Sequence, residues 1–238
     1  MKLGPTGARF NAMPCLVRGL GRLIPASVRR ALHAVWLRRR GCADNINTPE
    51  YWDAVYAREG QPTEGDSRDY DALHRAILNL MPRSARVLDV GCGTGRLACK
   101  LVAKGCVVVG IDFSKRAVEV CQALGLDARQ CTLPSIDASV GTFDAAVCTE
   151  VLEHLRDPKQ TVAAVQARVR EGGLVAFSVP AAAAIDREKE HVQLFGRGDL
   201  LRLMRAHLDD CRCVLVKGRQ RGSMLDSWLV WGVARRDP

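Results

Sequence analysis

Long apolar segments and paired cysteine motifs are missing from this 238-residue chain. No stretch reaches 18 consecutive apolar residues, so we expect no membrane-spanning helix. None of the ten cysteines forms a C-x-x-C pair, which argues against zinc sites and disulfides. Several cysteines lie instead within apolar runs, as the buried thiols of a reduced, intracellular protein do. These are Cys92, Cys99, Cys106, Cys121 and Cys148.

Acidic residues are absent from the first 43 positions. Nine of the 35 Lys and Arg residues and none of the 26 Asp and Glu residues lie there, so positions 44–238 carry 26 of each sign. A body with balanced charge argues against a large nucleic-acid groove. With 47% hydrophobic residues, the chain can bury one full α/β core. We therefore predict a basic N-terminal arm, residues 1–43, and a single domain, residues 44–238.

Residues 25–41 of the arm have the pattern of a basic amphipathic helix. Val28, Ala31, Leu32, Val35 and Trp36 recur at helical spacing on one side, and arginines occupy the rest. Three roles stay open for the arm: a lid over an active site, a peripheral contact with an anionic membrane, and RNA binding. Cytoplasm is the expected location, and the acid-free start keeps organelle targeting open.

A glycine-rich turn is the most informative motif of the chain. Residues 86–97 indicate a buried strand, a turn with glycines at 91, 93 and 95, and a helix. Glycines let the backbone approach a ligand closely, and the helix that follows directs unpaired N–H groups at it. Residues 107–112 form a second buried strand that ends in Asp112, which is placed to accept hydrogen bonds from ribose hydroxyls. The sixth position of a dinucleotide fingerprint holds Arg96 instead of glycine, which disfavours NAD.

Strand and helix patterns alternate along most of the chain, which predicts a parallel sheet covered by helices on both faces. The expected class is α/β: a Rossmann-like, seven-stranded, mostly parallel sheet in one domain, with the basic helical arm attached. A ligand should bind at the carboxyl ends of the strands. We expect strands at 86–90, 107–111, 128–131, 144–148 and 174–179, and an edge hairpin of 212–217 with 227–234. We expect helices at 51–58 (capped by Thr48), 70–80, 97–104, 115–124, 158–169 and 197–207.

These motifs resemble the class I S-adenosylmethionine (SAM)-dependent methyltransferases over about residues 50 to 205. Residues 143–158 and 171–180 are similar to that family's fourth and fifth strand regions, and the E-x-x-E-H run at 150–154 resembles the ubiquinone-biosynthesis type of O-methyltransferase. The resemblance implies SAM as cofactor. The implied cofactor contacts are Asp89, Gly91, Cys92, Gly93, Gly95, Asp112, Phe113, Gln130 and Glu150. The family often has an acid after its third strand for the adenine amino group, and here Gln130 or the backbone takes that place.

The E-x-x-E-H run also carries the candidate catalytic groups. On a helix, Glu150, Glu153 and His154 would share one face and converge. Two carboxylates and an imidazole suit Mg²⁺ or Mn²⁺, as the resemblance implies, and the alternative is metal-free base catalysis by His154 or His191 beside Glu153. His191 occupies a place comparable to that of a later histidine in the small-RNA 3′-end methyltransferases. A purely structural role for this run stays open as well.

We therefore expect a SAM-dependent methyltransferase that methylates an oxygen, in preference to a nitrogen, of a small lipidic or phenolic molecule. A metal-dependent RNA 3′-terminal methyltransferase is the second hypothesis, disfavoured by the neutral body and by the 5% aromatic content, which leaves few rings for stacking bases. A SAM-binding regulatory partner without turnover is the third, because binding is not catalysis. The pattern gives no indication of the oligomeric state.

Overall fold

The computed structural model describes residues 46–59, 70–181, 190–218 and 226–235, together with Val28. Apart from Val28, the predicted arm lies outside the described residues, and so does the amphipathic helix predicted over 25–41. Within the described part of the chain, no helix is long and apolar enough to cross a membrane.

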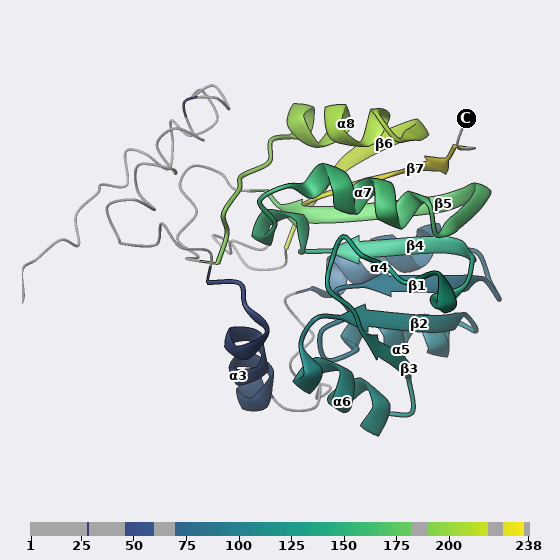
Figure 1. Ribbon diagram of the computed structural model, residues 1–238. Helices are drawn as coiled ribbons and strands as arrows, with labels where there is room; N and C mark the ends of the chain where they lie inside the picture. Colours follow the sequence, from purple (N-terminus) through teal and green to yellow (C-terminus); the bar gives the residue numbers. More distant parts are fainter. Residues whose placement is uncertain (1–27, 29–45, 60–69, 182–189, 219–225, 236–238) are drawn as a thin grey trace, which may run out of the picture.

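A single seven-stranded sheet forms the centre of the molecule, in the order β3-β2-β1-β4-β5-β7-β6 (Figure 1). Neighbouring strands from β3 to β5 pair in parallel, whereas β7 pairs antiparallel with both β5 and β6. The seven-stranded, mostly parallel sheet and the edge hairpin predicted from the sequence are therefore confirmed. The strands are β1 (Arg86–Val90), β2 (Val107–Asp112), β3 (Asp127–Gln130), β4 (Phe143–Thr149), β5 (Val169–Pro180), β6 (Leu208–Val216) and β7 (Ser227–Ala234).

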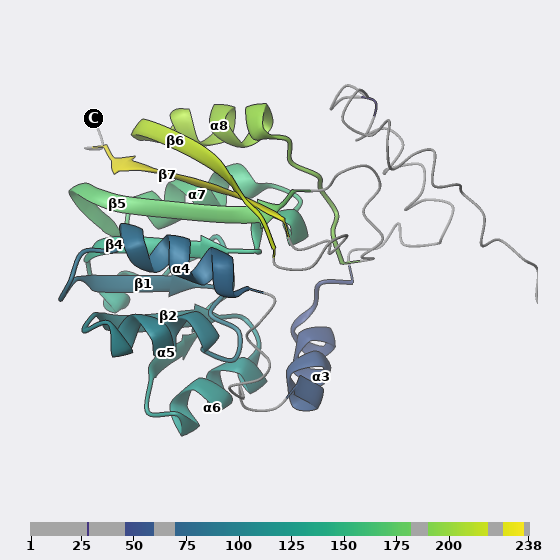
Figure 2. The same ribbon diagram turned by 180° about the vertical axis from the view of Figure 1, so that it is seen from behind.

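Helices cover both faces of this sheet. Figure 2 shows α4 and α5 in front of it, whereas α7 and α8 lie on the face seen in Figure 1. Side chains of β1 alternate accordingly: Leu88 and Val90 pack in the core beneath α7 and α8, and Val87 packs beneath α4 and α5. The helices are α3 (Pro49–Glu59), α4 (Asp71–Leu80), α5 (Arg96–Ala103), α6 (Lys115–Ala123), α7 (Pro158–Gln166) and α8 (Arg197–Arg205).

Element boundaries differ from the sequence prediction mainly where backbone pairing overrides the side-chain pattern. The helix predicted over 158–169 ends at Gln166, because Val169 already pairs with Phe143 and opens β5. Strand β6 likewise begins at Leu208, which pairs with Ala234 of β7. Such pairings depend on residues distant in sequence, so they leave little local signal.

Helix α3 lies beside the carboxyl ends of β1 and β2, next to α6 (Figure 1). Thr48 caps it as predicted, accepting a hydrogen bond from the Tyr51 amide at 3.2 Å. The Asp53 carboxylate accepts hydrogen bonds from the Ser114 hydroxyl at 2.5 Å and from the Arg116 amide at 3.0 Å. Because Ser114 caps α6, these bonds fix α3 to the start of α6 at the edge where a ligand is expected.

Candidate active site

The glycine turn connects β1 to α5 with three residues in the left-handed region. Gly91, Gly93 and Gly95 have φ values of 71°, 51° and 83°. The Gly91 amide donates to the Ile111 carbonyl oxygen at 2.8 Å, which holds the turn against the end of β2. A Cβ atom at Gly91 would lie 2.3 Å from a Val151 methyl carbon, so a larger residue here is strained in its backbone and has to displace the Val151 side chain. Helix α5 starts directly after the turn, so its N–H groups point to the space above it.

We predict that Gly91→Ala weakens SAM binding by about 10-fold or more, because a left-handed alanine costs about 1–2 kcal/mol and its methyl group displaces Val151. Gly125→Ala is the matched control, since Gly125 has a similar φ of 78° but nothing within 4 Å of the added Cβ. The control should lose only stability. Calorimetric titration with SAM and thermal unfolding of both variants separate the two effects. Equal SAM affinities in the two variants would contradict the close packing at Gly91.

Asp112 lies buried at the end of β2, directly beside the turn. Its carboxylate accepts hydrogen bonds from the Gly93 amide at 3.0 Å and the Ser114 amide at 2.9 Å. Burial raises the pKa of this carboxyl to about 6, and the backbone hydrogen bonds oppose the shift. Each carboxylate oxygen keeps a further lone pair, so the geometry is compatible with the predicted acceptance of ribose hydroxyls.

Asp89 is buried at 1% exposure, and neither of its carboxylate oxygens has a hydrogen-bond partner among the described residues. Burial, and then the nearby Asp112, raise its pKa to about 7. A buried carboxylate without a partner is costly unless a ligand supplies the missing donors or positive charge. SAM carries both a sulfonium and an ammonium group, so the residues around the turn fit this cofactor.

Asp89 should make the ligand-free protein less stable as the pH rises. Because its pKa is raised from 3.8 to about 7 on folding, the folded state binds more protons than the unfolded state between these values, and stability falls through this window. We predict that Asp89→Asn raises the free energy of unfolding more at pH 8 than at pH 5, by at least about 1 kcal/mol, while weakening SAM binding. Urea unfolding at both pH values measures the difference. A gain that does not depend on pH would contradict a raised pKa.

The remaining predicted cofactor contacts lie around the same turn. Gln130 ends β3, and its side-chain amide donates to the Phe113 carbonyl oxygen at 3.0 Å, so both residues border Asp112. Cys92 points instead toward α6, where its sulfur lies 3.9 Å from the sulfur of Cys121. A cofactor contact of Cys92 would therefore have to come from its backbone. The roles of these residues stay predictions.

The prediction that Glu150, Glu153 and His154 share one face of a helix is wrong. Between β4 and α7 the chain forms no α-helix: Glu150 has a left-handed φ of 54°, and only Leu152–His154 form a short 3₁₀ turn, η2. The Glu150 carboxylate accepts a hydrogen bond from the Ser178 hydroxyl at 2.7 Å, and burial raises its pKa to about 7. The bond to β5 directs Glu150 away from the helical arrangement on which the predicted metal set depended.

The third member of the group formed with Glu153 and His154 is His191, whereas the sequence predicted Glu150. Ligand atoms of Glu153, His154 and His191 all lie within 4.8 Å of one another, and we call these three residues the acceptor cluster. Glu153 is 2% exposed. The rings of His154 and His191 meet edge to face, with their centroids 5.0 Å apart. The amides of Val192 and Gln193 both donate to the Glu153 carbonyl oxygen, at 2.9 and 3.1 Å. These bonds tie the segment after residue 190 to η2, although the two are distant in sequence.

Two residues near the acceptor cluster, Asn47 and Glu190, have no clear signal in the sequence. The Trp52 ring packs edge-on against the His154 ring, with the ring centroids 5.2 Å apart, and its indole N–H donates to the Asn47 side-chain oxygen at 3.1 Å. The Tyr51 hydroxyl donates to the Glu190 carboxylate. Helical spacing suggests only that the aromatic residues of α3 pack on something, and the partner becomes visible only in the folded chain.

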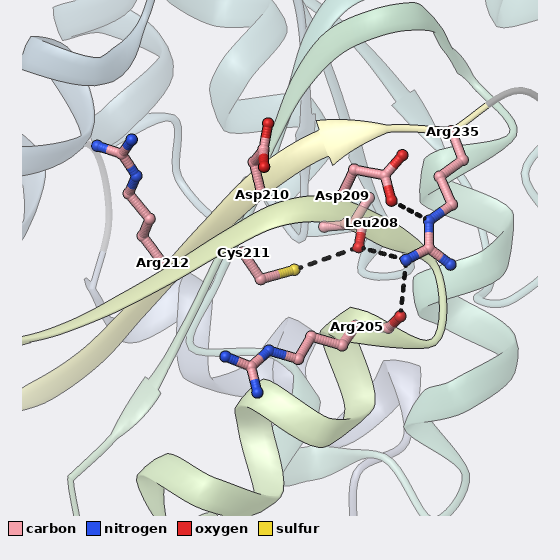
Figure 3. Close-up of a pocket in the computed structure, with 7 residues that line it drawn as sticks. All are labelled: Arg205, Leu208, Asp209, Asp210, Cys211, Arg212 and Arg235. Atoms are coloured by element: carbon pink, nitrogen blue, oxygen red, sulfur yellow. Dashed lines mark hydrogen bonds and ion pairs between the residues drawn. The ribbon is translucent and has the colours of Figure 1, made fainter.

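A hollow of about 400 Å³ lies at the opposite edge of the sheet, where β6 begins and β7 ends (Figure 3). It is lined by Arg205, Leu208, Asp209, Asp210, Cys211, Arg212 and Arg235. Arg235 donates to the Asp209 carboxylate at 2.5 Å and to the Leu208 carbonyl oxygen at 3.1 Å. These contacts close the end of the β6–β7 hairpin, and none of the residues predicted to carry chemistry lies there.

Comparison with known proteins agrees with this geometry. Residues 63–209, more than half of the chain, match the family described as "Methyltransferase domain". Relatives include the ubiquinone biosynthesis O-methyltransferases of Chromobacterium violaceum, 40% identical over 100 residues, and Vibrio campbellii, 39% identical over 128 residues. These matches cover 39% and 48% of this chain and 43% and 54% of those proteins. The similarity thus spans about half or less of the relatives' length.

Solved structures share the fold at low sequence identity. The N-methyltransferase NodS from Bradyrhizobium japonicum superimposes with a TM-score of 0.60 at 21% identity, over 72% of this chain and 99% of that one. The Burkholderia thailandensis 1,6-didemethyltoxoflavin-N1-methyltransferase, solved with S-adenosylhomocysteine, gives 0.60 at 20% identity, over 81% and 93%. With the family match and the glycine turn beside Asp112, these findings show that the chain belongs to the methyltransferase domain family, as a class I SAM-dependent methyltransferase.

Proposed function

We propose that this enzyme transfers a methyl group from SAM to a hydroxyl oxygen of a small phenolic or catecholic molecule. The observation that carries the proposal is the acceptor cluster: Glu153 and His154 follow β4, at the same sheet edge as the glycine turn, and His191 from the segment after β5 joins them. The name of the ubiquinone biosynthesis relatives supports oxygen as the methylated atom. The N-methyltransferases among the similar structures share the fold and carry no argument for nitrogen.

Methyl transfer from a sulfonium is an in-line displacement, and its demands explain why such a cluster is useful. The enzyme has to hold the acceptor oxygen close to the methyl group, and positioning supplies much of the rate. A phenol with a pKa of about 10 is protonated at neutral pH, so a base or a cation has to assist the loss of its proton. In the metal-free form of the proposal, an imidazole of the acceptor cluster accepts that proton and the Glu153 carboxylate stabilises the resulting charge.

A divalent cation is the second form of the proposal, favoured by the three converging ligand atoms. Glu153, His154 and His191 would hold the ion, and it would polarise the acceptor oxygen and lower the pKa of its proton. One carboxylate and two imidazoles suit Mn²⁺ better than Mg²⁺, which prefers oxygen ligands. The predicted ligand Glu150 is not part of this set, because it is bonded to Ser178.

Two consecutive measurements test the proposal. Calorimetry with SAM and S-adenosylhomocysteine first establishes cofactor binding, and turnover is then measured on phenols, catechols, amines and RNA 3′ ends. Each reaction is run after EDTA treatment and after return of Mn²⁺ or Mg²⁺. Methylated oxygen on a phenol or catechol, identified by mass spectrometry, is the expected result. Methylation of amines or RNA ends alone would overturn it, and SAM binding without any turnover would favour a regulatory subunit.

The predicted arm, residues 1–43, bears on which acceptor is used. A lipidic acceptor would be consistent with a basic amphipathic arm that lies on an anionic membrane. Flotation of the full chain with phosphatidylglycerol vesicles, compared with phosphatidylcholine vesicles, tests this prediction. Binding to neither would leave the lid and RNA hypotheses for the arm.

A further inference from the structure

The Asn47 side chain connects three segments that are far apart in sequence. Its amide nitrogen donates to the Glu190 carbonyl oxygen at 2.8 Å and to the His154 carbonyl oxygen at 3.4 Å. Its oxygen accepts the indole N–H of Trp52 at 3.1 Å. This orientation is the one that the partners require, because carbonyl oxygens only accept and an indole N–H only donates. Asn47 therefore joins the start of α3 to η2 and to the segment that carries His191.

The same Glu190 carbonyl oxygen also contacts the ring of His154. The Nδ1 atom of His154 lies 3.1 Å from it. Since a carbonyl oxygen cannot donate, this hydrogen bond requires the proton to be on Nδ1. A neutral imidazole carries only one N–H, so Nε2 then presents a lone pair.

The lone pair of Nε2 lies on the side of the acceptor cluster. Nε2 is 3.9 Å from a Glu153 carboxylate oxygen, and the ring centroids of His154 and His191 lie 5.0 Å apart. The Trp52 ring meets the His154 ring nearly perpendicularly, at an interplanar angle of 79°, and limits its rotation. A base or a metal ligand in the acceptor cluster needs an unprotonated Nε2. The Glu190 carbonyl oxygen favours this state, because it keeps the proton of the ring on Nδ1.

We propose that Asn47 and the main-chain carbonyl of Glu190 are positioning groups that hold His154 as the Nδ1–H tautomer, with Nε2 directed at the methyl acceptor. The inference rests on the proposed function, since it assigns His154 a role at the acceptor. It also explains how α3 is joined to the acceptor cluster: Asn47 bonds both the Glu190 carbonyl oxygen and the Trp52 indole N–H.

The tautomer can be observed directly by NMR on the full chain with ¹⁵N-labelled histidine and S-adenosylhomocysteine, at an alkaline pH where imidazoles are neutral. His154→Asn identifies the resonances. We expect a protonated Nδ1 and an unprotonated Nε2 in the wild type. Asn47→Asp puts a carboxylate oxygen opposite two carbonyl oxygens, so His154 should become a mixture of tautomers. Once an acceptor is known, kcat should fall about 10- to 100-fold, as for other groups that orient a ligand side chain.

Arg58→Ala is the control for a general disturbance of α3, because among the described residues this exposed side chain bonds only to its own helix, at the Ala54 carbonyl oxygen. It should change neither the tautomer nor kcat. If Asn47→Asp does not fold, Asn47→Ala replaces it. An Nε2–H tautomer in the wild type, or an unchanged tautomer in a folded Asn47 variant, overturns the proposal. The NMR result needs no turnover, so a failure of the proposed function would show separately, as absent O-methylation with the tautomer intact.

Discussion

His154→Asn should lower kcat for the methyl acceptor by about 100- to 10,000-fold, the usual contribution of a positioned acid or base. Asparagine is the sharpest substitution, because its side-chain amide can replace Nδ1 as the donor to the Glu190 carbonyl oxygen while Nε2 is lost. Affinity for S-adenosylhomocysteine should change by less than about threefold, since the residue lies outside the glycine turn. Steady-state kinetics and calorimetry measure the two quantities.

The control for this variant is His207→Gln, which alters a histidine beyond the end of α8. It should keep the wild-type kcat. Partial recovery of His154→Asn by excess Mn²⁺ would identify the acceptor cluster as a metal site, because excess ion compensates for a lost ligand but not for a lost base. A wild-type kcat in both His154→Asn and His191→Gln would eliminate the proposed role of the acceptor cluster.

Asp112→Ala should weaken SAM and S-adenosylhomocysteine binding by about 100-fold or more. The variant removes the acceptor of two backbone N–H groups, from Gly93 and Ser114, and each hydrogen bond to a charged group contributes about 1.5–3 kcal/mol. It also removes the predicted partner of the ribose hydroxyls. Calorimetric titration of the folded variant gives the affinity directly, and thermal unfolding shows how much of the change is a loss of stability.

Asp127→Ala is a matched control for Asp112→Ala, because Asp127 is an exposed acid on the neighbouring strand, paired only with Arg129 in the described part of the chain. Its removal should leave cofactor affinity within about twofold, since exposed ion pairs contribute little. An unchanged affinity in Asp112→Ala would show that the ribose assignment is wrong. The glycine turn and Asp89 would then have to provide the affinity.

The sequence alone was sufficient for the sheet, the cofactor turn and the family. Positive φ values at Gly91, Gly93 and Gly95 follow from the local requirements of a tight turn, and buried strands and amphipathic helices each have their own period. Register then brings Asp112 beside the turn, because β1 and β2 are adjacent parallel strands. Each of these inferences depends on neighbours in the chain or on a general rule of parallel sheets.

The acceptor cluster depended on tertiary structure. The E-x-x-E-H run suggests a helical face, but hydrogen bonds between Glu150 and Ser178 of β5 stabilise a left-handed residue there in place of the helix. The Glu190 carbonyl meets His154 from 36 positions away, and Asn47 reaches Glu190 across 143 positions. No local pattern encodes contacts of that length. The sequence determined the glycine turn and the methyltransferase family, whereas only the folding of distant segments onto η2 decided that Glu153, His154 and His191 come together, because their contacts join residues far apart in the chain.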